Sequence, residues 1–247
     1  KQNLSYRFLF IPETIGAITW LSKNEEKIKN IKHGLVATCL GDSGHMTYKK
    51  SRDGNNIIDK IVIDVLNESK EQFDVLDFFP TGSDERQFCS PGFNLPIGSL
   101  MRTVYDKFTE YHTSADDLDN VKSKYLENSF EKYLKIVKLL ENFQEKKVKT
   151  VEKHEEIIKN ESENEIFYTS LNQKCEPQLS KRGMYGVIGG LKNKVDNMMA
   201  VLWVLNLSDG TNSVSDITKR SHLDVQDIKN AIIILVKNNL LTIKTKN

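Results

Sequence analysis

Apolar residues gather in short runs along the first part of the chain, and these runs predict strands. Residues 6–11 are a dense apolar run that is typical of an inner strand, and Pro12 ends it. Residues 34–40 form a second run, which stops at the turn-forming sequence Gly-Asp-Ser-Gly. Residues 73–79 and 93–101 are further strand candidates. The pattern thus predicts four strands.

Between and after these runs, apolar residues recur at helical spacing. Residues 15–30 and 57–66 place their apolar side chains on one face, which predicts two amphipathic helices. Residues 123–145 predict a longer helix that packs on the sheet. Its apolar stripe consists of Phe130, Tyr133, Leu134, Val137, Leu140 and Phe143. Strands that alternate with helices predict an α/β layer fold with a mixed, mostly parallel sheet.

The end of the chain has a different pattern. A helix at 198–207 is followed by a turn and by a short helix that Ser215 caps. A second helix at 225–238 and a small strand at 240–244 come next. Two helices joined by a tight connection after a leading helix predict a winged helix-turn-helix.

These patterns divide the chain into three expected parts. Residues 1–145 would form the α/β domain, and residues 196–247 the winged helix-turn-helix domain. Residues 146–195 would hold a charged linker and a segment that packs back on the α/β domain. The sequence opens at Lys1 without methionine and enters an apolar run almost at once, which predicts that further sequence precedes it.

The composition is that of a folded protein with free thiols. Apolar residues make up 38% of the 247 residues, which is enough for a core. A net charge of +1 favours neither nucleic acid nor an anionic membrane. The three cysteines are scattered, as expected for thiols in a reducing compartment. Because no apolar run is long enough to span a membrane, we expect no membrane partner and a cytoplasmic location.

Polar residues follow each predicted strand. Glu13 follows the first strand, Asp42 the second and residues 84–86 the third, and His112 lies on a polar loop after the fourth. Because ligands gather at the carboxyl ends of strands in α/β sheets, we expect these side chains to converge. Carboxylates together with a histidine suit zinc, which activates a water molecule for hydrolysis.

Each carboxylate also has a simpler interpretation. Glu13 could be an acid favoured at a helix N-terminus, Asp42 a turn residue and Asp84 a helix cap. His112 differs, because the polar neighbours Tyr111, Thr113 and Ser114 are not typical of a core histidine.

Four ordered motifs resemble those of the di-zinc aminopeptidases, the family of the bacterial leucyl aminopeptidases. They are IPETIGAITWL at 11–21, LVATCLGDSG at 35–44, SDERQFCSPGFNLP at 83–96 and YHTSADDLD at 111–119. With CEPQLSKRG at 175–183, the whole chain resembles a bacterial subgroup of "aminopeptidase-like domain" proteins that end in a winged helix. The resemblance implies a zinc exopeptidase-like three-layer sandwich.

The resemblance also implies roles for individual residues. Glu13 would be the general base, and Asp42 and His112 would be ligands of two different zinc ions. A second group would contact these ligands or the substrate: Tyr111, Asp84, Glu85, Arg86, Asp116 and Asp119. Two positions depart from the family pattern, because Thr14 replaces a ligand glutamate and Glu85 replaces a histidine. A complete site would hold two zinc ions, with further ligands upstream of Lys1.

These expectations lead to one main hypothesis and two alternatives. The main hypothesis is a zinc-dependent aminopeptidase-like hydrolase of peptide or amide bonds, incomplete in this chain, that acts on a small peptide or aminoacyl substrate. The first alternative is a catalytically inactive binding or regulatory protein on the same scaffold. The second is a DNA-binding regulator, but the helix at 225–238 carries only Lys229 and Lys237 against Asp227. That charge favours a packing module or a homo-oligomer contact over nucleic acid.

Overall fold

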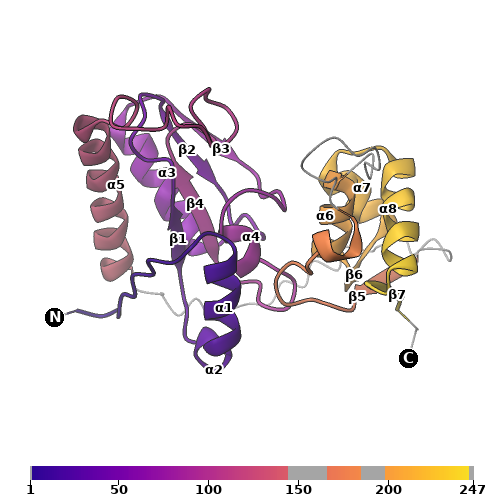
Figure 1. Cartoon of the computed structure of the whole chain (residues 1–247). Coiled ribbons are helices and arrows are strands. Elements are labelled where there is room, and N and C mark those ends of the chain that lie inside the picture. Colours follow the sequence, from indigo (N-terminus) through magenta and orange to yellow (C-terminus); the bar gives the residue numbers. More distant parts are fainter. Residues whose placement is uncertain (1, 144–165, 185–197, 245–247) are drawn as a thin grey trace.

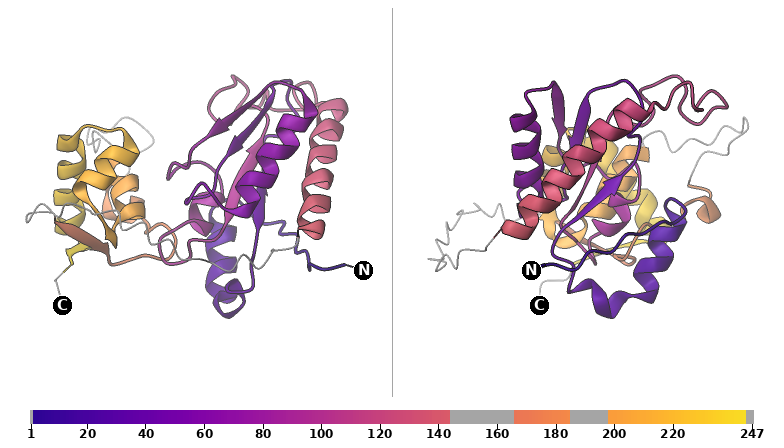
Figure 2. Two further views of the ribbon diagram at one scale, coloured as in Figure 1. Left: turned by 180° about the vertical axis from the view of Figure 1, so that it is seen from behind. Right: turned by 90° about the vertical axis from the view of Figure 1, so that its left-hand side faces the viewer.

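The computed structural model describes residues 2–143, 166–184 and 198–244 (Figure 1). An α/β unit, drawn in indigo to magenta, lies beside a smaller unit drawn in orange and yellow, as the reverse view in Figure 2 also shows. Among the helices of these residues, none combines the length and apolarity that a bilayer span requires.

The α/β unit is built on four short strands. These are β1 (Gly34–Ala37), β2 (Met46–Lys49), β3 (Phe73–Leu76) and β4 (Ile97–Met101). Within the described residues their order is β1-β4-β2-β3. β1 runs parallel to β4 and β2 runs parallel to β3, whereas β2 and β4 are antiparallel. The sheet is therefore mixed and mostly parallel, as the sequence predicted.

Helices cover both faces of this sheet and complete the predicted three-layer sandwich (Figure 1). α3 (Ile57–Ser69) and α5 (Ser123–Asn142) cover one face, and α1 (Ile15–Lys23), α2 (Glu25–Ile28) and α4 (Glu85–Phe88) cover the other. Successive strand residues enter opposite cores, because side chains alternate along a strand. Leu35 packs with α3 and α5, whereas Val36 packs with α1 and α4.

The segment at 6–11 is not an inner strand, so that prediction was wrong. Its Phe8 and Phe10 side chains are 79% and 95% exposed. An apolar run becomes a strand where a neighbouring strand satisfies its backbone hydrogen bonds, and no described strand pairs with this run. The chain is held beside α5 instead, where the Glu141 carboxylate accepts the N–H groups of Asn3 and Leu4.

The other predicted elements of this unit exist but are shorter. β1 and β3 each end three residues early, β4 begins at Ile97, and the helix predicted at 15–30 breaks at Asn24 between α1 and α2. α5 ends at Asn142. The apolar stripe of α5 was also misplaced, because Phe130 is 60% exposed while Ile136 is fully buried.

β2 was not predicted at all. Its apolar residues Met46 and Tyr48 alternate with Thr47 and Lys49, which is the pattern of a strand with one solvated face. All four side chains are nevertheless buried. The strand lies inside the sheet between β4 and β3, so its polar side chains face a second core.

The smaller unit is a winged helix-turn-helix, as predicted. Its elements are β5 (Phe167–Ser170), a 3-10 turn (Ser180–Arg182), α6 (Met198–Leu207), β6 (Asp209–Ser213), α7 (Val214–Ser221), α8 (Val225–Lys237) and β7 (Leu241–Ile243). The described strands form an antiparallel sheet in the order β6-β5-β7. β5 thus joins this sheet although it lies in the stretch at 146–195, which was expected to precede the winged helix. Most of that stretch lies outside the described residues.

The helix cap of α7 differs from the prediction. Ser213, not Ser215, is the N-cap, and its hydroxyl accepts the Asp216 N–H at 3.2 Å. The Asp216 carboxylate accepts the Ser213 N–H in return at 2.9 Å. β6 runs directly into this cap, so the residues that were expected to form a turn are partly strand.

Candidate functional site

Glu13 lies in the loop before α1, and charges from two other parts of the chain change the pKa of its carboxyl. Glu13 is an exposed residue, but partial burial of its carboxyl still raises the pKa above its usual range. The Asp84 and Glu85 charges raise this pKa further, while Arg86 and His112 lower it. These charges belong to the α4 segment and to the loop that carries His112.

The backbone next to Glu13 is held in an uncommon conformation. Thr14 has φ 60° and ψ −66°, which is a strained geometry for a β-branched residue. Asp84 stabilises it, because its Oδ1 accepts the Thr14 N–H at 2.6 Å. Arg86 donates to the Thr14 hydroxyl at 3.3 Å. The position that departs from the aminopeptidase motif therefore connects the Glu13 loop to α4.

Asp84 does not cap α4 through its side chain as the simpler interpretation proposed. It occupies the N-cap position, but its carboxylate binds Thr14 instead of the first turn of the helix. Burial raises the pKa of Asp84, and the Glu85 charge adds to this rise, while the hydrogen bond from Thr14 opposes it. Glu13 and Asp84 are thus two neighbouring carboxyls whose pKa values are both raised.

His112 lies on an exposed loop beside Tyr111. The two rings are stacked, with centroids 4.0 Å apart and planes 15° apart. His112 has a positive φ of 57°, and Cys39, just after β1, has a φ of 46°. Backbone of this kind is enriched at functional sites. A charged His112 imidazole would lower the pKa of Glu13, and the meeting of these two side chains in one site stays a prediction.

Asp42 is engaged in a turn. Its carboxylate accepts the Gly44 N–H at 2.8 Å, the Thr103 N–H at 3.3 Å and the Thr103 hydroxyl. These bonds tie the loop after β1 to the residues that follow β4. They also explain Gly44, since a Cβ there would lie 2.1 Å from the Thr103 hydroxyl oxygen. The turn interpretation of Asp42 therefore has direct structural support.

The described residues do not by themselves form a metal site. Across residues 2–143, 166–184 and 198–244, no three His, Cys, Asp or Glu side chains gather closely enough to hold a metal ion. The ligand roles of Asp42 and His112 stay predictions.

Glu85 is fully buried and forms an ion pair with Lys49 of β2. Nζ of Lys49 lies 2.7 Å from Oε1 of Glu85, and both side chains are 0% exposed. The same ammonium donates to the Thr81 carbonyl at 2.6 Å and to the Tyr105 hydroxyl at 3.2 Å. The glutamate that replaces the family's histidine therefore binds a lysine in this chain.

The remaining predicted residues make local contacts. Arg86 pairs with Glu176 from the segment between β5 and α6. Asp116 accepts a hydrogen bond from Asn120 at 3.2 Å, and Asp119 lies 3.7 Å from the Lys122 ammonium. These aspartate contacts stay within the loop. The predicted support of His112 by either aspartate stays a prediction.

Sequence reasoning missed Lys49, Tyr105 and Cys39. The alternation of residues 46–49 could have placed Lys49 on a strand, but nothing in the sequence marks it as buried. Burial raises the pKa of the Cys39 thiol, the hydrogen bond with Thr38 opposes this, and the Asp42, Asp116 and Glu13 charges add to the rise. A thiol that stays protonated is a poor nucleophile.

The matches with known families divide the chain between the α/β unit and the winged helix, as the structure does. Residues 1–143 match the family described as "Domain of unknown function (DUF4910)". Residues 166–243 match a winged helix-turn-helix family. The first match covers the sheet, its helices and every predicted site residue.

The chain spans about half the length of the Clostridium acetobutylicum proteins that it matches. A Clostridium acetobutylicum protein named "Putative polysaccharide biosynthesis protein with aminopeptidase-like domain" is 48% identical over 98% of this chain and 50% of its own length. A solved structure named "putative peptidase" from the same organism is 45% identical, with a TM-score of 0.56 over 99% of this chain and 49% of that chain. A zinc aminopeptidase from Bacillus subtilis is 12% identical, with a TM-score of 0.42 over 53% of this chain and 33% of its own.

Proposed function

This chain belongs to the DUF4910 family, and its C-terminal part matches a winged helix-turn-helix family. We propose that it supplies the general base of a metal-dependent hydrolase of peptide or amide bonds, in line with the aminopeptidase-like name of its Clostridium relative. The observation that supports this proposal is the environment of Glu13. The pKa of its carboxyl is raised, partly by the Asp84 charge, although the His112 charge lowers it. The next residue, Thr14, has a strained backbone and donates its N–H to Asp84. A carboxylate whose pKa is raised is suited to take a proton from an attacking water molecule.

The proposal assigns one step to this chain. Glu13 in its ionised form accepts the proton of the water that attacks the amide carbonyl, and then passes it to the leaving amine. The residues described here do not complete a metal site, so no step is assigned to a metal ion. Zinc bound through His112 and Asp42 would need further ligands, which we expect outside these residues.

Asp84→Asn tests whether Glu13 is the titrating base. An asparagine keeps an oxygen that accepts the Thr14 N–H, but it removes the charge that raises the Glu13 pKa. A base works in its ionised form, so the acid limb of kcat/KM lies above the usual glutamate value of about 4.3. In the variant we expect that limb to move to lower pH. A pH–rate profile that stays in place would exclude Glu13 as the group it reports.

The metal content of the natively purified full-length protein tests the metal-dependent part. We expect bound zinc that falls in His112→Ala and stays unchanged in His45→Ala. His45 is the control histidine, because Asp74 already holds its imidazole at 2.7 Å. Elemental analysis measures both variants. A native protein without metal would defeat the proposal, and equal zinc in both variants would remove His112 from the ligand set.

A second candidate function is a catalytically inactive binding protein on the same scaffold. Two contacts favour it, because the Asp42 carboxylate is engaged in a turn and the Glu85 carboxylate in a buried ion pair. An activity panel separates the two candidates. It should hold aminoacyl and peptide amides and, because the Clostridium relative is named for polysaccharide biosynthesis, N-acylated amino sugars.

A further inference from the structure

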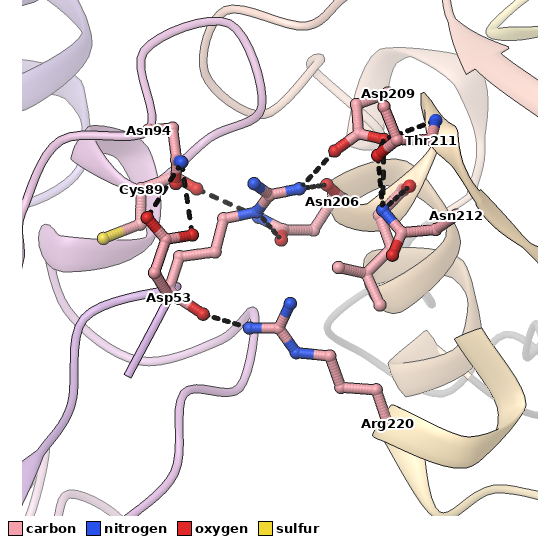
Figure 3. Close-up of polar contacts among 10 residues, drawn as sticks. Asp53, Cys89, Asn94, Asn206, Asp209, Thr211, Asn212 and Arg220 are labelled. Carbon is pink, nitrogen blue, oxygen red and sulfur yellow. Dashed lines mark hydrogen bonds and ion pairs between the residues drawn. The ribbon is translucent and has the colours of Figure 1, made fainter. Parts of the chain in front are cut away.

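The winged helix is fixed to the α/β unit by a buried arginine. Arg52, in the loop after β2, is 7% exposed. Its Nε donates to the Asn206 side-chain oxygen at 3.0 Å, and its Nη2 donates to the Asn206 carbonyl at 3.0 Å and to Asp209 at 2.8 Å. Figure 3 shows Asn206 and Asp209 on the winged-helix side of this contact. A guanidinium with three acceptors is well satisfied despite its burial.

Other hydrogen bonds across the same interface have their donors in the winged-helix unit and their acceptors in the α/β unit. Arg220 of α7 donates to the backbone carbonyl of Arg52, and the Asn206 amide donates to the Cys89 carbonyl at 3.3 Å (Figure 3). Burial alone would raise the pKa of Asp209, but hydrogen bonds from Thr211 and Arg52 outweigh it and hold that pKa below its usual value. Asp209 is therefore ionised at neutral pH, when it pairs with Arg52.

The interface also includes the segment that leads into α4. The Phe78 ring meets the Trp203 ring of α6 edge-on, with centroids 6.4 Å apart. Phe79 packs against the winged-helix core, and the Lys49 ammonium lies 3.8 Å from the centroid of its ring. Phe78 and Phe79, which precede α4, are thus packed between the winged helix and the buried Lys49–Glu85 pair.

A second set of contacts reaches α4 from the segment between β5 and α6. The Glu176 N–H donates to the Gln87 side chain at 2.8 Å, and the Cys175 N–H donates to the Ser90 hydroxyl at 2.9 Å. The Glu176 carboxylate pairs with Arg86, which also donates to Thr14. A continuous series of contacts therefore leads from the winged-helix unit through α4 to the residue next to Glu13.

We propose that the winged helix is a structural support of the Glu13 site, with Arg52 and Glu176 as positioning residues that fix α4 and thereby the Thr14 backbone. The functional meaning of this support rests on the proposed role of Glu13, but the support itself does not. The basic residue of α7 nearest the interface, Arg220, faces the α/β unit, and the outer face of α8 exposes Ile233 and Val236. This charge distribution suits an internal contact better than a phosphate backbone.

Hydrogen exchange of the Thr14 amide in the full-length protein tests this proposal, since Asp84 accepts that N–H. Glu176→Gln keeps the size of the side chain and removes the charge that holds Arg86. Arg52→Leu removes the contact with Asn206 and Asp209. We expect the Thr14 amide to exchange about tenfold faster in each variant, the effect of losing one charge-assisted bond. Arg182→Leu, at an exposed arginine of the same segment, is the matched control and should leave exchange unchanged.

Glu176→Gln decides the outcome if Arg52→Leu does not fold. Unchanged Thr14 exchange in a folded Glu176→Gln protein would overturn the proposal. The readout does not depend on catalysis, so failure of the proposed function is seen separately. If Glu13→Gln left turnover unchanged while Thr14 exchange still responded to Glu176→Gln, the structural support would stand and the general-base role would fall.

Discussion

Replacement of Glu13 by glutamine is expected to lower kcat by about 10²–10⁴-fold, the usual contribution of a positioned general base. Glutamine has nearly the same size and leaves the contacts of Thr14 with Asp84 and Arg86 in place. It cannot accept a proton at neutral pH, so the loss should appear in kcat and in kcat/KM together. Steady-state kinetics of the full-length protein, on whichever amide of the substrate panel it hydrolyses, measure the effect.

Glu26→Gln is the matched control for this experiment. Glu26 is exposed on α2, so its replacement by glutamine makes the same chemical change outside the Glu13 loop and α4. We expect its kinetics to equal those of the unaltered protein. A Glu13→Gln enzyme that retains full turnover would show that the base is another group, and Asp84, whose pKa is also raised by burial, would be the next residue to test.

The local pattern of apolar and polar residues was sufficient to predict elements whose apolar face and ends are marked in the sequence. α3 is an example, because its apolar spacing is clear and the Asp59 carboxylate accepts the Asn56 N–H at 2.8 Å to begin the helix. The winged helix was predicted for the same reason. The segment at 6–11 was mistaken for a strand because an apolar run shows what a residue prefers, not whether a partner strand lies beside it.

The site was harder to predict because its contacts join distant parts of the chain. Glu13 and Asp84 are brought together by the packing of α1 on α4, which no spacing in the sequence encodes. The expectation that all strand ends would meet assumed parallel neighbours, whereas β2 and β4 are antiparallel, so residues after β3 and β4 meet only where the loops fold back, as Thr81 and Tyr105 do. Lys49 could not be found either, since a lysine in a sequence is normally taken to be solvated.

Lys49→Met is expected to destabilise the protein by about 3–5 kcal/mol, as removal of one member of a buried ion pair does. The variant would leave the fully buried Glu85 carboxylate without its ammonium partner, and Oε2 of Glu85 already has no hydrogen-bond partner in the described residues. Burial lowers the pKa of Lys49, and the Glu85 charge opposes this, so the lysine depends on its partner as well. Denaturant unfolding measures the difference in the free energy of unfolding.

Two further variants separate the buried charge from the loss of packing. Lys135→Met removes the exposed pair with Glu68 and should cost at most about 1 kcal/mol. Lys49→Met combined with Glu85→Leu removes both charges and should recover most of the stability lost in Lys49→Met, because an apolar pair needs no solvation. If the double variant were as unstable as Lys49→Met, packing around Gly82 and Tyr105 would be the cause. There a Cβ on Gly82 would lie 2.0 Å from the Tyr105 hydroxyl oxygen, so the space is already full.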